Sequence, residues 1–193
     1  MTSSAQQTLG KFIHALAAKQ PTPGGGGAAA VGAAVGASTA SMAAAYTQRK
    51  KDKESGAAEV AEDLIKTLNV DILLQTADED AEAYQNLQRT WKDADMSDDE
   101  RACIEARALA VPTNLLEACH AHIIAIKHFL PYCNENITSD AKVGVHLLAG
   151  AARSAYQTVL VNKPPEEDKQ RLQHLLKEIR DTEDFVLEFD ETS

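Results

Sequence analysis

Apolar and small residues recur every three to four positions along most of the chain, the spacing that places them on one face of a helix. Six helices are predicted, the first over residues 6–19, where the prolines at 21 and 23 end it. The second helix follows these prolines and ends near residue 53, and the third covers 57–92. The fourth begins near residue 97 and is expected to kink or split at Pro112. The last two cover 138–162 and 166–187. No segment shows the alternation of strands. The pattern therefore predicts an all-α, single-domain bundle over residues 1–193, frayed at its last residues.

The second helix is built almost entirely from small residues, in the stretch PTPGGGGAAAVGAAVGASTASMAAAYTQRKK. Its alanines and glycines recur every four residues at Ala28, Gly32, Gly36, Ala40 and Ala44, so one face is nearly flat. Another backbone can approach such a face closely. Glycine inside a helix costs about 1 kcal/mol relative to alanine, which suggests that this contact matters. We expect a buried, closely packed helix rather than a membrane span, because the run is barely apolar.

Composition and charge exclude several partners. The 193 residues carry a net charge of −10. Nucleic acids and anionic membranes both attract basic surfaces, so neither is an expected partner. The three cysteines are widely spaced, and no HExxH-like pattern occurs, so neither a disulfide framework nor a metal site is expected. The N-terminus lacks a hydrophobic signal core, which predicts a cytoplasmic protein.

Four consecutive glycines, Gly24 to Gly27, precede the helix of small residues. Glycines let backbone N–H groups converge on a ligand, and the N-terminus of a helix adds a partial positive charge. No strand precedes these glycines, so a dinucleotide-binding motif is not indicated. Two interpretations remain: a ligand-binding loop, and a tight turn before a closely packed helix.

Asp80 interrupts an apolar stripe. The stripe has helical spacing and consists of Leu73, Ala77, Tyr84, Leu87 and Trp91. A carboxylate on a buried face is costly unless it has a partner, and burial raises its pKa toward the range useful for proton transfer. Asp80 is therefore either a catalytic acid–base group or a carboxylate that hydrogen-bonds the end of a neighbouring helix.

Two charged segments lie near predicted helix ends. Arg49, Lys50, Lys51 and Lys53 end the predicted helix of small residues, where the helix dipole favours cations and where an anionic substrate group could bind. Ser139 and Asp140 fit an N-cap and a first-turn acid, with Thr138 as the alternative cap.

Five segments, in order, resemble the cyclodeaminase/cyclohydrolase family of folate enzymes: PTPGGGGAAAVGAAVGA, SMAAAYTQRKK, DEDAEAY, AVPTNLLEAC and NENITSDAKVGVHLLAGAARSAYQTVLVN. The resemblance covers nearly the whole chain. It implies an all-helical homodimer that binds a tetrahydrofolate derivative as substrate, with no metal and no permanently bound cofactor. The residues at motif positions are Pro23, Gly24, Gly25, Gly26, Gly27, Lys50, Lys51, Asp80, Asn134, Asn136, Ser139 and Asp140.

The resemblance implies roles for these residues. Asp80 would be the catalytic base and Asp140 a second acid or orienting group, while the glycines, the asparagines and Ser139 would bind substrate. Lys50 and Lys51 would bind its glutamate tail. The segment AYTQRKK departs from the family pattern, with Ala45 for an asparagine and Arg49 for a glycine.

Two reactions belong to this family, and we expect the first. This is the cyclohydrolase reaction, which converts 5,10-methenyltetrahydrofolate to 10-formyltetrahydrofolate in one-carbon metabolism. It is favoured because the chain shows no second domain that would generate a formimino group, and because the glycine run has four members. The alternatives are a formiminotetrahydrofolate cyclodeaminase and a non-catalytic folate-binding or scaffolding dimer, which the altered AYTQRKK segment permits.

Overall fold

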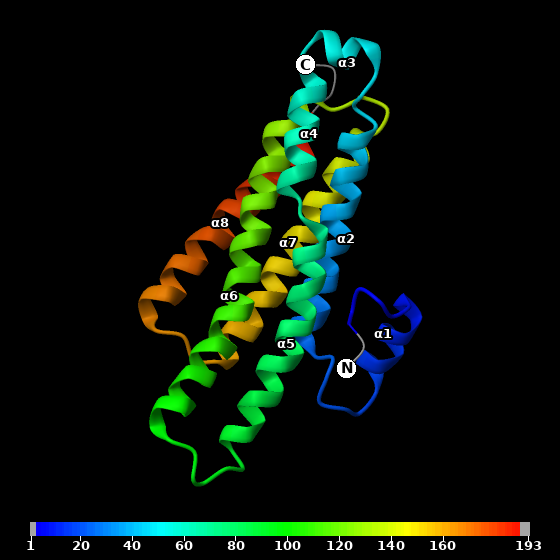
Figure 1. The fold of residues 1–193 in the computed structure, drawn as a ribbon. Helices are drawn as coiled ribbons and strands as arrows, with labels where there is room; N and C mark the ends of the chain where they lie inside the picture. Colours follow the sequence, from blue (N-terminus) through cyan, green and yellow to red (C-terminus); the bar gives the residue numbers. More distant parts are fainter. Residues whose placement is uncertain (1–2, 190–193) are drawn as a thin grey trace.

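The computed structural model describes residues 3–189, and helices make up most of them, without a strand in that range (Figure 1). The all-α prediction is confirmed. The fraying is predicted for residues 188–193; Glu188 is still helical, and residues 190–193 lie outside the described part. The elements are α1 (Leu9–Ala17), α2 (Gly25–Ala45), α3 (Lys50–Glu54), α4 (Ala57–Thr67), α5 (Val70–Thr90), α6 (Asp98–Phe129), a 3-10 turn η1 (Leu130–Tyr132), α7 (Thr138–Val161) and α8 (Glu166–Glu188).

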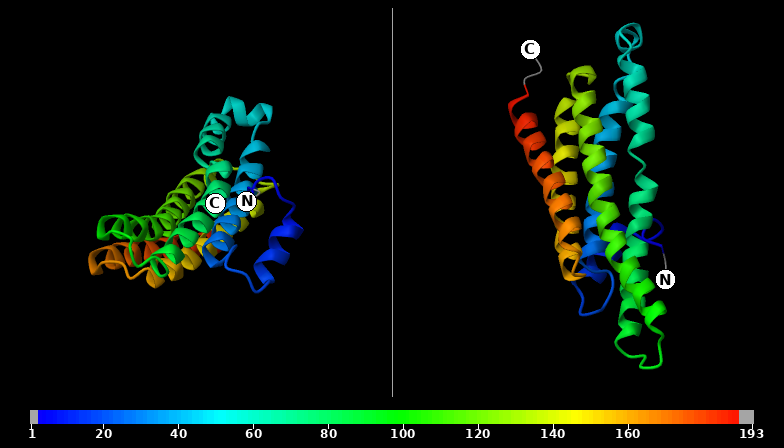
Figure 2. Two further views of the ribbon diagram at one scale, coloured as in Figure 1. Left: turned by 60° about the horizontal axis from the view of Figure 1, so that its bottom comes forward. Right: turned by 90° about the vertical axis from the view of Figure 1, so that its left-hand side faces the viewer.

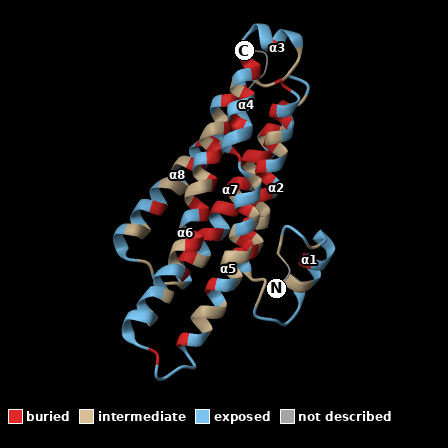
Figure 3. Cartoon of the chain, in the orientation of Figure 1, coloured by how far each residue is buried: buried red, intermediate tan, exposed pale blue. Residues whose placement is uncertain are grey.

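The long helices form an elongated bundle in which α2 and α7 run antiparallel and pack against each other (Figures 1 and 2). α5 flanks α2, while α6 packs against α5, α7 and α8. α1 lies apart from the long helices, beside the beginning of α2. Buried residues concentrate on the inner faces of α2, α6 and α7, where the core is (Figure 3).

Glycines allow the close approach of α2 and α7. A Cβ atom on Gly144 would lie 2.8 Å from the carbonyl oxygen of Gly36, and one on Gly36 would lie 3.0 Å from that of Gly144. Both are shorter than ordinary contacts, so a side chain at either position would push the helices apart. The expected close packing is confirmed at Gly36. It is wrong at Gly32, where a Cβ atom would meet nothing within 4 Å.

Two predicted helices are each divided in the structure. α2 ends at Ala45 rather than near residue 53, because the buried Thr47 hydroxyl donates to Ala43 and accepts from the Asn134 backbone N–H at 3.0 Å. The helix predicted over 57–92 breaks at Leu68 and Asn69. Leu68 is buried, and the Asn69 side chain caps α5 by accepting from the Ile72 N–H. At both boundaries the hydrogen bonds of a polar side chain accompany the end of one helix or the start of the next.

Pro112 lies inside α6, which is continuous, so of the predicted kink or split the split is wrong and the kink stays a prediction. Proline has no N–H to donate to the carbonyl four residues earlier, which here belongs to Ala108. The side-chain amide of Asn162, at the end of α7, donates to that carbonyl at 3.0 Å. A tertiary hydrogen bond therefore replaces the missing helical one.

The beginning of α7 differs from the prediction. Ile137 is the N-cap and has no side-chain capping bond, while Thr138 and Ser139 are already inside the helix. The Thr138 hydroxyl instead donates back to the carbonyl of Asn134 at 3.1 Å. The predicted capping role of Thr138 or Ser139 is therefore wrong.

Two stretches among the described residues, Gly25–Ala45 and Asp98–Tyr132, are long and apolar enough to cross a membrane by length and composition alone. The core helix of a globular protein passes the same test, and about half of each stretch is buried in the bundle. The cytoplasmic location stays a prediction.

Candidate active site

Asp80 of α5 lies against the first turn of α2. Its Oδ2 accepts a hydrogen bond from the Gly27 backbone N–H at 2.9 Å. The first N–H groups of a helix have no partner within it, so this carboxylate satisfies one of them. A Cβ atom on Gly26 would lie 2.0 Å from Asp80 Oδ1, which only a glycine avoids. The hydrogen bond to a neighbouring helix end, one of the two interpretations of Asp80, is thus present in the structure.

The environment of Asp80 also changes its acidity. Burial raises the pKa of this carboxyl above its usual range, and the hydrogen bond from Gly27 opposes part of that increase. A carboxyl with a raised pKa accepts a proton more readily near neutral pH than an exposed one. The capping contact and a proton-transfer role are therefore compatible.

Asp80 lines a cavity of about 1020 Å³, at the upper end of the size range of small-molecule sites. Three glycines of the predicted loop, Gly24, Gly25 and Gly26, line it as well, while Gly27 contributes through its bond to Asp80. The remaining walls come from Pro21 and Thr22, from the following turns of α2, and from α5, α6 and α7, and they are mostly apolar. Among the lining residues that the structure describes, Asp80 is the one carboxylate, and no lysine or arginine is present.

The aromatic residues of the α5 stripe lie on the cavity wall rather than in the core. Leu73 and Ala77 are buried as expected, but Trp91 remains 64% exposed and Tyr84 37%. Their rings meet edge to face, with centroids 6.3 Å apart and planes at 83°. The sequence placed them on the correct helix face but did not show that, within residues 3–189, no neighbouring helix covers it. Tyr84 and Trp91 follow Asp80 by four and eleven positions, a helical spacing that places all three residues on the same face.

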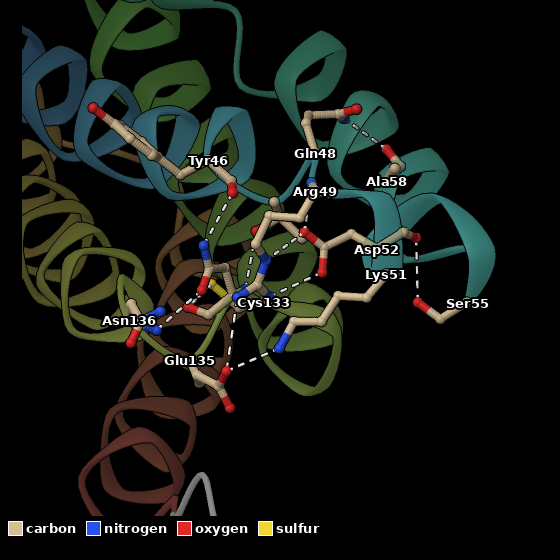
Figure 4. A network of polar contacts seen from close by, with 12 residues as sticks. Tyr46, Gln48, Arg49, Lys51, Asp52, Ser55, Ala58, Cys133, Glu135 and Asn136 are labelled. Atoms are coloured by element: carbon tan, nitrogen blue, oxygen red, sulfur yellow. Dashed lines mark hydrogen bonds and ion pairs between the residues drawn. The ribbon is translucent and has the colours of Figure 1, made fainter.

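The predicted basic cluster lies at the other end of α2. α2 has 21 residues, so its ends are about 30 Å apart at 1.5 Å per residue. Arg49 pairs with Asp52, and Lys51 Nζ lies 2.9 Å from Glu135 Oε1 (Figure 4). The side chain of Lys50 is 91% exposed. Within one chain, these cations do not reach the Asp80 cavity.

The remaining predicted residues group with the basic cluster. Asn134 is buried, and its side chain donates to the Tyr46 carbonyl and accepts from the Asn136 N–H, both at 3.1 Å. Asn134 thus holds the turn that precedes α7 against the end of α2. Asn136 is exposed, as is Ser139, whose hydroxyl donates to Asp140 at 3.4 Å.

The predicted residues therefore divide into two clusters. One contains the glycines and Asp80; the other contains Lys50, Lys51, Asn134, Asn136, Ser139 and Asp140. Pro23 belongs with the first, since a Cβ atom on Gly27 would lie 3.6 Å from its ring. Across residues 3–189, no three His, Cys, Asp or Glu side chains gather as a metal site would require.

Comparison with known families extends over both clusters. The family model for formiminotransferase-cyclodeaminase matches residues 8–181. The chain belongs to this family. A solved structure of formiminotetrahydrofolate cyclodeaminase from Thermotoga maritima shares the fold, with a TM-score of 0.73, 21% identity, and coverage of 94% of this chain and 92% of that one. A comparison with curated proteins gives no match. The family predicted from the motifs is thus confirmed, and with it a folate enzyme.

Proposed function

We propose that this protein releases ammonia from 5-formiminotetrahydrofolate and closes the ring to 5,10-methenyltetrahydrofolate. The observation that carries the proposal is Asp80, a half-buried carboxyl group with a raised pKa in an apolar cavity of substrate size. The family model and the similar structure are both described by the cyclodeaminase reaction. They favour it over the cyclohydrolase that we expected from the sequence.

The reaction needs one proton to be moved between two nitrogens. The substrate enters as the protonated formimino cation, C=NH2+. N10 attacks its carbon and loses a proton, and the resulting amino nitrogen takes up that proton and leaves as ammonia, so the positive charge stays on the methenyl product. The proton removed equals the proton delivered, so a single carboxylate can carry out both transfers. In the proposed mechanism Asp80 accepts the N10 proton and then donates it to the leaving nitrogen.

The surroundings of Asp80 suit a cationic substrate. The protonated formimino group and the methenyl product both carry one positive charge, and Asp80 is the carboxylate that lines this part of the described cavity. Apolar walls exclude water and strengthen the attraction between opposite charges. Exclusion of water also protects the methenyl product, which water would otherwise hydrolyse.

The proposal includes a homodimer. Val35, Met42 and Tyr46 leave apolar side chains exposed on α2, and Val143 and Leu147 do the same on α7, which packs against it. A second copy lying antiparallel on this face would cover these side chains. It would also bring the end of one chain that carries Lys50 and Lys51 toward the Asp80 cavity of the other. The predicted binding of the glutamate tail by these lysines is thereby retained, across subunits.

The test is to supply each of the family's two substrates separately. With 5-formiminotetrahydrofolate, we expect rapid ammonia release together with the rise of the near-ultraviolet absorption of the methenyl product. With 5,10-methenyltetrahydrofolate, we expect that band to decay no faster than in buffer. Rapid decay without ammonia release from the formimino compound would assign the cyclohydrolase reaction instead. Folate binding with neither reaction would support the non-catalytic dimer.

A further inference from the structure

The end of the cavity at Trp91 has an exposed aromatic wall that the proposed proton transfer does not use. Asp80, Tyr84, Leu87 and Trp91 follow one another at intervals of four, three and four residues, so they occupy one face of α5. All four line the cavity. At 1.5 Å per residue, the wall extends about 16 Å along the helix from Asp80 to Trp91.

Trp91 is exposed although its burial would stabilise the fold. Large aromatic side chains are among those that contribute most to stability when buried, yet 64% of this residue remains accessible. Its ring is held edge to face against Tyr84, so the pair presents a positioned aromatic surface. The cavity beside it is lined by Ala108 of α6 and by Thr158 and Val161 of α7.

We propose that Trp91 and Tyr84 form the surface that binds the bicyclic ring of the folate, which makes Trp91 a substrate-binding residue. This inference rests on the proposed function. N5 belongs to the ring, so a substrate whose formimino group lies at Asp80 has its ring close to that residue. Tyr84 is one turn away, about 6 Å along the axis. The Trp91 ring has its centroid 6.3 Å from that of Tyr84 and is nearly perpendicular to it, so a flat heterocycle can stack on one ring and meet the edge of the other.

The test compares three substitutions: Trp91→Ala removes the ring, Trp91→Phe keeps a flat ring, and Ile72→Ala removes an exposed apolar side chain of the same helix outside the cavity. Binding of 5-formyltetrahydrofolate is measured by calorimetry. We expect about 5- to 100-fold weaker binding for Trp91→Ala, the usual effect of losing one stacking partner, and near wild-type binding for the other two. Equal binding by Trp91→Ala and the wild type would overturn the proposal.

Two further measurements separate this inference from the proposed reaction. Trp91 is the only tryptophan in the chain, so the fluorescence of the wild type reports on this position alone. Its emission should change on saturation with 5-formyltetrahydrofolate, and unchanged emission would overturn the inference. With 5-formiminotetrahydrofolate, Trp91→Ala should raise KM with kcat within about threefold. Folate binding that depends on Trp91 without any turnover would refute the proposed reaction and leave this inference standing.

Discussion

At the scale of single residues, the carboxyl group of Asp80 is half-buried between the first turn of α2 and the cavity. The sequence placed it on a helix face with apolar neighbours and left open whether it serves structure or chemistry. The choice could not be made from spacing, because it depends on a partner 53 positions away, the Gly27 N–H. Gly26 carries the complementary constraint, since its missing side chain makes room for the carboxylate.

Neutralising Asp80 should not destabilise the fold at neutral pH. Burial raises the pKa of Asp80, so its ionised form is less favourable in the folded than in the unfolded chain. Asp80→Asn should therefore have an equal or higher urea midpoint at pH 7. The difference should shrink as the pH falls through the raised pKa toward the ordinary value of about 3.9. A clearly lower midpoint at pH 7 would show that the charge stabilises the end of α2.

Gly26→Ala should disturb Asp80 directly. The new methyl group would overlap the carboxylate, so we expect a lower Tm and a fall in kcat of at least about tenfold. Gly25→Ala is the matched control, because a Cβ atom there would meet nothing within 4 Å. Its Tm should equal or exceed that of the wild type in thermal denaturation followed by circular dichroism. Equal Tm losses in both variants would contradict the geometry.

At the scale of helices, the pattern of small residues predicted that α2 packs closely, and Gly36 with Gly144 shows how. It did not predict where helices end. Hydrogen bonds of Thr47 and Asn69 mark helix boundaries. Asn162 donates to the carbonyl of Ala108, which has no helical donor because residue 112 is a proline. Local propensity is similar on both sides of each boundary. Asn134 lies 87 positions from Thr47, and Asn162 lies 54 positions from Ala108, so both partners are beyond the range of local pattern.

Alanine substitutions at the two glycines of α7 should change the free energy of unfolding in opposite directions. Gly144→Ala places a methyl group 2.8 Å from the carbonyl oxygen of Gly36, and we expect it to cost about 1–3 kcal/mol of unfolding free energy. Gly150→Ala, on the same helix, adds its methyl to open space and should stabilise the helix by up to about 1 kcal/mol. Urea denaturation of both variants distinguishes them. Similar losses would contradict the close approach of α2 and α7.

At the scale of the whole molecule, the motifs identified the residues of two clusters but not the distance between them. The family match spans both, yet α2 separates them by about 30 Å. Order along a sequence says nothing about which ends of antiparallel helices meet. The cavity itself could not be predicted from the sequence. The pattern on α5 shows which face is apolar, but it does not show that Trp91 is left exposed among the described residues.

We expect a homodimer in light scattering at micromolar concentration. Met42→Glu combined with Val143→Glu places charges on the exposed apolar face of α2 and α7 and should yield a monomer with unchanged helicity. Ile72→Glu, at an exposed apolar position on α5, should remain dimeric. A monomeric wild type would refute the assembly, and a dimeric double variant would move the interface to another face.

The central claim is that Asp80 transfers the proton that allows ammonia to leave. The most direct measurement is single-turnover ammonia release from 5-formiminotetrahydrofolate with enzyme in saturating excess, for the wild type and for Asp80→Asn. Asparagine keeps the size of the side chain and can still accept the Gly27 N–H, while it cannot take up the N10 proton. We predict a rate about 10²- to 10⁴-fold lower for the variant, with folate binding retained. A variant that binds folate and releases ammonia at the wild-type rate would contradict the account.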